Sequence, residues 1–310
     1  MLHRGVCRAS GRQSWSALLA RRGPFFGLLL ALLALLLQPT ARAAGVLRVD
    51  FIDVGQGDSA LVTSPTGKTV LIDGGPRRSS RALTTFLAGH TKGPIDLILL
   101  THRHEDHLGG LSAVVRTIGA RLFLDAPVPH SGPAYAELVQ VLAANGVDAR
   151  LATRGRKIDL GGGAAITLVG PPEPAIVGSR SDVNANSVVA RLDYGTFSAL
   201  FAGDAEAATE TWLLSSGAEI HATVLKVAHH GSRYASSPRF LRAVGARIAV
   251  VSAGTGNDYG HPAPETLARV AHSGTSVYRT DMDGDVAIET NGLTVHIHAS
   301  SGREEKQAIR

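Results

Sequence analysis

The chain has 310 residues, with 31 Lys and Arg, 26 Asp and Glu, and a single cysteine, Cys7. One cysteine excludes an internal disulfide framework and a zinc site built on several thiolates. Residues 1–43 hold six of the basic residues and no acidic one, and taking six from 31 leaves 25 basic against 26 acidic residues. We therefore expect no strong basic nucleic-acid patch on the rest of the chain.

The first 43 residues have the three parts of a secretory signal peptide. A basic stretch precedes the apolar run Phe25–Leu37, and the small residues Ala41 and Ala43 follow at the spacing of a cleavage site. The run is shorter than the ~20 residues that cross a bilayer as a helix, although an uncleaved membrane anchor remains the alternative. The sequence thus predicts a signal peptide over 1–43, a domain over 44–300 without a membrane span, and a polar tail over 301–310.

Export is the first testable prediction. The mature protein should begin near Ala44 and be recovered from the periplasm or the extracellular medium, because the leader is expected to be removed on export. N-terminal analysis or intact-mass measurement checks this expectation. A leader retained on membrane-bound protein would contradict it.

The remaining chain alternates strand and helix signals. Runs rich in β-branched or apolar residues predict strands at Val46–Val54, Ser59–Thr63, Thr69–Ile72, Asp96–Thr101, Arg121–Leu124, Ala164–Val169, Val188–Tyr194, Phe197–Phe201, Thr223–Ala228, Arg247–Ser252, Ser276–Tyr278, Asp285–Glu289 and Thr294–Ile297. Helices are predicted at Arg78–Ala88, Leu108–Ile118, Pro133–Asn145, Ala205–Leu214, Pro238–Ala243 and Pro264–Ala271. Gly170–Ser181 is a long loop, suited to a lid or rim, and the tail from Ser300 is expected to fray. Antiparallel strand groups separated by helices, in two halves, predict one α/β domain: an αββα sandwich of two packed mixed sheets flanked by helices.

The strongest chemical signal is the segment from Thr101 to Gly110. His102, His104, Asp106 and His107 follow directly on a buried strand. Alternate residues of an extended loop point the same way, so His102 and His104 can meet one metal while Asp106 and His107 meet a second. Imidazole and carboxylate are ligands for zinc or manganese. The alternative, a polar surface loop, explains four ligand-type residues behind an apolar strand poorly.

Two later segments complete this set. Asp204 follows Gly203 at the end of a strand, a placement that suits a carboxylate bridging two cations but is also that of an ordinary turn. His229 and His230 end another strand, and a half-buried histidine pair needs partners.

These motifs resemble the metallo-β-lactamase superfamily, and more finely the hydrolase domain of ComEC-type competence proteins. The finer match is carried by Asp53–Asp58, Leu71–Gly75, Asn184–Ser187, Leu225–Ser232 and Tyr259–Pro262, within a resemblance from about Val46 to about Glu289. It implies the metallo-β-lactamase fold and two divalent metal ions, zinc or manganese. The ligands it implies are His102, His104, Asp106, His107, Asp204 and His230.

Roles for the other polar residues follow from the same set. Asp106 is expected to orient the nucleophile as well as bind metal, and Lys226 to offer a charge to the substrate, although a strand lysine is also compatible with a solvated face. Neighbouring side chains at a strand end point to opposite sides, so both histidines can hardly face one cation equally. The resemblance to the superfamily's last histidine motif assigns His230 to metal and His229 to the substrate. Asp73 is expected behind the metal histidines, with Asp58 and His261 bordering the site. Asn186 stands where the superfamily often has a further histidine, which leaves one metal a ligand short.

The sequence therefore predicts an exported hydrolase that uses two metal ions. Two cations lower the pKa of a shared water from ~15.7 toward ~7 and make hydroxide available for attack. A phosphoester or phosphodiester, in a small molecule or a nucleic acid, is the leading substrate because the ComEC-like branch is associated with nuclease activity. A lactone or β-lactam hydrolase and a non-catalytic metal-binding module of the cell envelope are the alternatives, and the oligomeric state is left open.

Overall fold

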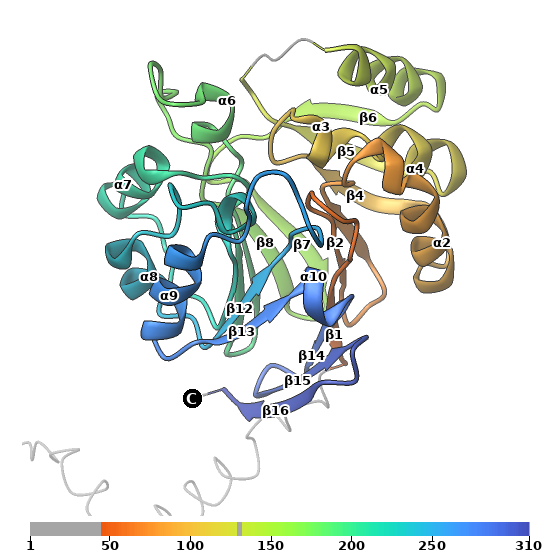
Figure 1. Cartoon of the computed structure of the whole chain (residues 1–310). Coiled ribbons are helices and arrows are strands. Elements are labelled where there is room, and N and C mark those ends of the chain that lie inside the picture. The colour runs from red at the N-terminus through yellow and green to blue at the C-terminus, as the bar shows by residue number, and fades with distance from the viewer. Residues whose placement is uncertain (1–44, 129–131, 310) are drawn as a thin grey trace, which may run out of the picture. The chain divides into compact units, whose positions relative to one another are not determined.

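The computed structural model describes residues 45–128 and 132–309. Over these residues the strands form two sheets that pack face to face, with helices on both outer faces (Figure 1). The αββα sandwich predicted from the sequence is thus confirmed. The signal peptide predicted over 1–43 lies outside the described residues.

The first sheet has nine strands in the order β16-β15-β14-β1-β2-β3-β4-β5-β6, counted over the described residues. Their bounds are β1 Leu47–Phe51, β2 Ala60–Thr63, β3 Thr69–Ile72, β4 Ile95–Leu99, β5 Ala120–Asp125, β6 Asp148–Leu151, β14 Val286–Thr290, β15 Thr294–Ala299 and β16 Glu304–Ala308. The pairs from β3 through β6 are parallel and the others are antiparallel.

The second sheet has seven strands in the order β13-β12-β11-β10-β9-β8-β7, again within the described part of the chain. They are β7 Lys157–Gly161, β8 Ala164–Leu168, β9 Ala190–Tyr194, β10 Phe197–Phe201, β11 Val224–Lys226, β12 Ile248–Val251 and β13 Ser276–Arg279. The pairs from β10 through β13 are parallel. Both sheets are therefore mixed, as the sequence predicted.

Helices cover the outer face of each sheet. The helices and short helical turns are η2 Arg77–Ser79, α2 Ser80–His90, α3 Glu105–Leu108, α4 Leu111–Thr117, α5 Pro133–Ala144, α6 Asp182–Ala185, α7 Ala207–Ser215, η3 Ala228–Gly231, α8 Pro238–Val244, α9 Pro264–His272 and α10 Thr280–Asp283. Figure 1 shows α2, α4 and α5 on one side of the sandwich and α7, α8 and α9 on the other. Each helical layer covers its own apolar cluster, while a third cluster fills the space between the sheets, where Phe51 and Phe201 stack with centroids 5.9 Å apart.

The tail predicted to fray is an edge strand. Glu304–Ala308 forms β16, which pairs with β15 from His298 opposite Glu304 to Thr294 opposite Ala308. The Tyr278 hydroxyl donates a hydrogen bond to Glu305 Oε2 at 2.7 Å, which connects this strand to Tyr278. The expectation was wrong because the pairing of a polar edge strand depends on its partner, which composition does not reveal.

The helix predicted over Leu108–Ile118 is broken into α3 and α4. The break falls at Gly109 and Gly110, and a Cβ on Gly110 would lie 2.2 Å from the carbonyl oxygen of Gly74. Two backbones therefore pass in direct contact here. This contact sets the start of α4 against the turn that follows β3.

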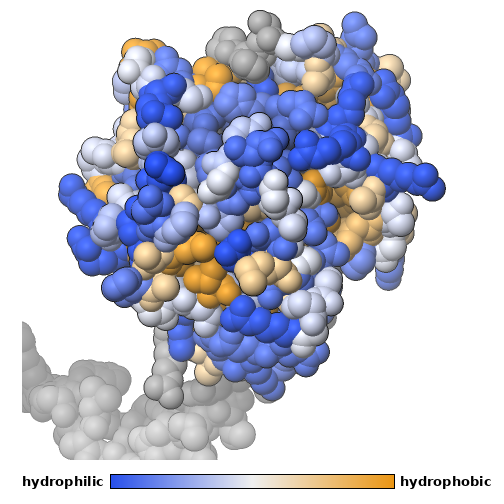
Figure 2. Space-filling view, viewed as in Figure 1, coloured by the Kyte–Doolittle hydropathy of each residue, from blue (hydrophilic) through white to orange (hydrophobic). Residues whose placement is uncertain are grey.

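The carboxyl ends of the parallel strands meet along one edge of the sandwich, at the top of Figure 1. Polar loops follow β3, β4, β10, β11 and β12 at that edge, which is where ligands bind in such sheets. Figure 2 shows hydrophilic residues over most of the face in this view, with apolar residues in small groups. Within the described residues, no helix is long and apolar enough to cross a membrane.

Candidate metal centre

The loop after β4 brings the imidazole rings of two histidines together, the Nε2 of one toward the Nδ1 of the other. His102 Nε2 lies 3.1 Å from His104 Nδ1, with the two rings nearly perpendicular. His102 is buried, and burial and the neighbouring imidazoles, His107 first, hold the pKa of His102 well below its usual value. A neutral imidazole at this place is the form that binds a metal.

Asp204 enters the same space from the other sheet. It follows β10 in a tight turn at Gly203, whose φ of +52° and whose contacts with Ser187 and Thr101 leave little space for a side chain. The Asp204 amide donates to Ser187 Oγ at 3.2 Å, which fixes the turn. The carboxylate is thereby buried between the two sheets.

The two oxygens of Asp204 face different histidines. Oδ2 lies 3.5 Å from His102 Nε2, while Oδ1 lies 3.3 Å from His107 Nε2 and 3.7 Å from His230 Nε2. Burial opposes ionisation, but the surrounding imidazoles, His107 first, outweigh it and hold the pKa of Asp204 well below its usual value. The carboxylate thus stands between two groups of ligand atoms.

Asp106 joins the second of these groups. Its Oδ2 lies 3.2 Å from His230 Nε2, and Asp106, His107 and His230 form one cluster whose ligand atoms can share a cation. His102, His107 and Asp204 form another such cluster.

Several atoms at the centre of the site lack a partner. Asp204 Oδ1, His107 Nε2 and His230 Nε2 are buried and make no hydrogen bond. Buried polar atoms are nearly always paired, so three such atoms converging on one point require a missing ligand. Imidazole nitrogen and carboxylate oxygen fit a divalent transition metal there. Asp106 belongs to the same cluster, so these side chains have the ligand atoms that a metal centre needs.

Asp73 lies behind the histidines, where the sequence had placed it. Its Oδ2 lies 2.8 Å from His107 Nδ1, and it accepts the backbone amide of Thr101 at 2.8 Å and the Thr101 hydroxyl at 2.7 Å. Burial opposes protonation of His107, but the carboxylates, Asp204 before Asp73, raise its pKa well above the usual value. Asp73 holds the proton on Nδ1, which leaves Nε2 toward the centre.

Lys226 does not face the substrate, contrary to the sequence expectation. It is 4% exposed, its Nζ contacts Asp58 Oδ2 and also donates to the Val227 carbonyl at 3.0 Å. Lys226 ends β11, an interior strand, on the same face as Val224, whose side chain packs between the two sheets, and it is therefore enclosed. Burial opposes ionisation of Asp58, but the Lys226 ammonium outweighs it and holds the pKa of Asp58 at about 2.

The Asp58–Lys226 pair supports a metal-facing histidine. Asp58 Oδ1 lies 3.1 Å from His230 Nδ1, which also lies 3.0 Å from the carbonyl oxygen of Ser252. The Ser252 carbonyl, with the Asp58 carboxylate beside it, keeps the proton on Nδ1 and leaves Nε2 for the centre. Asp58 thus borders the site from behind rather than from the substrate side.

The expectation that His229 and His230 point to opposite sides of a strand is wrong. The strand ends at Lys226, and both histidines lie in the turn η3 with left-handed backbones, at φ of 50° and 53°. His229 Nε2 lies 3.7 Å from Asp204 Oδ2, and its Nδ1 lies 3.0 Å from Glu206 Oε1. Both rings therefore face Asp204. Glu206 was missed by sequence reasoning, although an acidic residue two places after Asp204 was a visible signal.

Asn186 and His261 occupy different surroundings. The Asn186 amide is fully engaged, accepting from the Ile176 amide at 2.8 Å and donating to the carbonyls of Ile176 and Asp182 at 2.7 Å each. It anchors the Gly170–Ser181 loop instead of facing the metal centre or a substrate.

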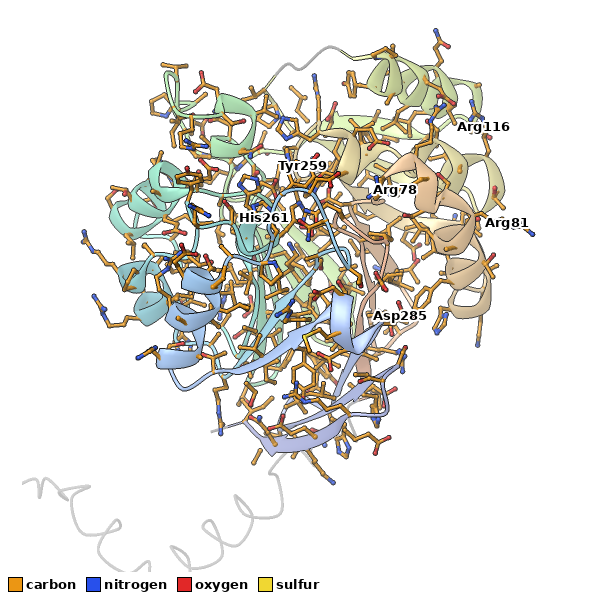
Figure 3. All side chains as sticks on the ribbon, viewed as in Figure 1. Arg78, Arg81, Arg116, Tyr259, His261 and Asp285 are labelled. Carbon is orange, nitrogen blue, oxygen red and sulfur yellow. The ribbon has the colours of Figure 1, made fainter. Side chains whose placement is uncertain are left out.

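His261 lies beside His229 and His230, with its ring centroid 5.4 Å from that of His229, and burial lowers its pKa to about 4. Figure 3 shows His261 and Tyr259 on the loop between β12 and α9.

The sequence of this chain is similar to those of known proteins. The model of the metallo-beta-lactamase superfamily matches residues 52–255. ComE operon protein 3 of Bacillus subtilis is 28% identical over 257 residues, which cover 77% of this chain and 32% of that protein. Competence protein ComA of Neisseria gonorrhoeae is 28% identical over 248 residues, which cover 80% of this chain and 33% of that protein. The chain thus spans about a third of the length of these relatives.

The fold has a solved counterpart. The metallo-beta-lactamase fold protein YhfI from Bacillus subtilis superposes with a TM-score of 0.52 at 13% identity, covering 79% of this chain and all of that one. At this identity the likeness concerns the fold alone. Because the superfamily model matches well over half of the sequence, and the matched strands carry the histidine and aspartate clusters, the chain belongs to the metallo-β-lactamase superfamily.

Proposed function

We propose that the protein is an exported phosphodiesterase that depends on two divalent metal ions, zinc or manganese. The observation that carries this proposal is the placement of Asp204, whose two carboxylate oxygens face two separate groups of histidines. Divalent cations held there would act as Lewis acids and lower the pKa of a bound water to about 7. The motif resemblance to the competence-protein branch, associated with nuclease activity, favours a phosphodiester over a lactone or β-lactam.

The side chains at this centre would have different roles. His102 and His104 would bind one cation and Asp106, His107 and His230 the other, with Asp204 shared between them. Asp106 is a carboxylate ligand with access to solvent, since its side chain is 31% exposed while that of Asp204 is 3% exposed. It is therefore placed to accept a proton from the attacking water and to orient that water toward the substrate.

Substrate preference tests the proposal. The metal-loaded protein should hydrolyse bis(p-nitrophenyl) phosphate and leave the β-lactam nitrocefin intact. Hydrolysis of nitrocefin alone would replace the proposal with the β-lactam alternative. A protein that binds metal and is inert toward both, and toward single-stranded and duplex DNA and RNA, would favour the non-catalytic module.

Asp106 is the residue to change first. Asp106→Ala should keep its fold and lower phosphodiester turnover by about two to four orders of magnitude, because one group then loses both its carboxylate ligand and its proton acceptor. Turnover and metal content are measured together. Glu265→Ala is the matched control, since Glu265 is an exposed carboxylate in the first turn of α9 and should change neither quantity. Undiminished turnover with full metal content in Asp106→Ala would remove Asp106 from the site.

A further inference from the structure

The two halves of the proposed centre have unequal numbers of ligands. Beside Asp204 Oδ1 stand three side chains, from Asp106, His107 and His230. Beside Asp204 Oδ2 the sequence motif supplies only the pair His102 and His104. The position from which the superfamily often supplies a further histidine is held by an asparagine whose amide is engaged in three hydrogen bonds elsewhere.

His229 stands on the deficient side. Its Nε2 lies 3.7 Å from Asp204 Oδ2, the oxygen that is 3.5 Å from His102 Nε2. The opposite oxygen, Oδ1, faces His107 and His230 at 3.3 and 3.7 Å. The four imidazoles are thus divided between the two carboxylate oxygens, two on each.

The backbone holds His229 in this place. Its φ of 50° and ψ of 47° lie in the left-handed region, which costs a residue other than glycine about 1 kcal/mol or more. The His229 amide donates to the Gly203 carbonyl at 3.1 Å, and its own carbonyl accepts from the Ser232 amide at 2.8 Å. The hydrogen bond to Gly203 therefore holds the turn against the loop that carries Asp204. Strained backbone of this kind is concentrated at functional sites.

Glu206 fixes which nitrogen is available. Its Oε1 lies 3.0 Å from His229 Nδ1 and orients the ring so that Nε2 points toward Asp204. A carboxylate behind an imidazole is the usual second partner of a metal-binding histidine. Glu206 stands behind His229 as Asp73 stands behind His107.

We infer that His229 is a ligand of the first cation and takes the place of the histidine that the chain lacks. Each cation would then have three imidazole or carboxylate ligands of its own besides the shared Asp204, and Glu206 would act as a positioning residue through His229. The inference rests on the proposed two-cation centre and replaces the assignment of His229 to the substrate that the sequence suggested.

Metal binding tests this without any substrate. Chelator-stripped protein is titrated with Zn²⁺ against a chromogenic chelator. Wild type should bind two equivalents tightly, whereas His229→Ala should bind one tightly and the second more than about 100-fold more weakly. Glu206→Gln should keep two equivalents and weaken one of them by about 10- to 100-fold, the range for an outer partner of a ligand. His272→Ala is the matched control, an exposed histidine at the end of α9 that should leave both equivalents unchanged.

The outcomes separate this inference from the proposed function. Two tight equivalents in His229→Ala, or in His229→Gln should the alanine variant not fold, would overturn the ligand assignment. A single equivalent in wild type, unaffected by His229→Ala, would overturn it as well. Weakened Zn²⁺ binding in His229→Ala together with an absence of phosphodiester hydrolysis in wild type would keep the assignment and reject the proposed function.

Discussion

Asp204→Asn should abolish hydrolysis and lose both metal ions, the largest effect expected of any single substitution in this chain. The amide keeps the size of the side chain but removes the negative charge that both groups of histidines share. Since metal ions supply several kcal/mol of transition-state stabilisation, turnover should fall by about 10³-fold or more. Metal content by elemental analysis and turnover of bis(p-nitrophenyl) phosphate are measured on the same preparation.

A neighbouring aspartate provides the control for this change. Asp193→Asn alters a partly exposed carboxylate of β9, in the same sheet, whose partner is Arg191. It should retain metal and turnover, because exposed ion pairs contribute little. Asp204→Asn with a full complement of metal would mean that Asp204 does not join the two groups.

Lys226→Met should lower the free energy of unfolding by about 3–5 kcal/mol, the usual cost of leaving one charge of a buried ion pair without its partner. Lys226 and Asp58 are both buried, and burial works against the charge that Asp58 carries. The measurement is urea denaturation of chelator-treated protein, so that lost metal does not contribute. Lys68→Met, an exposed lysine, should change stability by less than about 1 kcal/mol.

The double variant and the pH dependence sharpen this test. The double variant Asp58→Asn with Lys226→Met should be less destabilised than the sum of the two single changes, because the partners are in contact.

The pKa of Asp58 lies below its usual value, so the contribution of Asp58 to the free energy of unfolding is complete above about pH 4 and is lost as the pH falls through about 2. Equal stability of Lys226→Met and Lys68→Met would contradict the buried pair.

The parts of the site that lie close together in sequence were predictable. His102 to His107 fall within one short segment, from the loop after β4 into α3, and the buried strand before them is visible as a continuous apolar run. Their meeting with Asp204 followed from its place after another strand, since strand ends gather at one edge of a sheet.

The directions of individual side chains were not predictable. Lys226 ends a strand, and alternation separates its two faces without saying which face is enclosed by a second sheet. His229 and His230 have left-handed backbones, a conformation that no residue pattern other than glycine or asparagine signals. The expected exposure of Lys226 and the expected opposite directions of His229 and His230 both failed to match the geometry for this reason.

The strands that were missed share a physical cause. β6 is exposed along its length, and β7 is mostly exposed or half-buried and ends at consecutive glycines. Neither has the apolar alternation that distinguishes a strand from a loop. Both are edge strands, held by backbone pairing to β5 and β8.

Metal-dependent turnover measures the proposed two-cation phosphodiesterase most directly. The protein is stripped with a chelator, Zn²⁺ or Mn²⁺ is returned in steps, and hydrolysis of bis(p-nitrophenyl) phosphate is followed at each step. The stripped protein should be inactive, and turnover should rise until two equivalents per chain have been added. Turnover that survives stripping, or that is complete at one equivalent and unchanged by the second, would contradict a centre of two cations joined by Asp204.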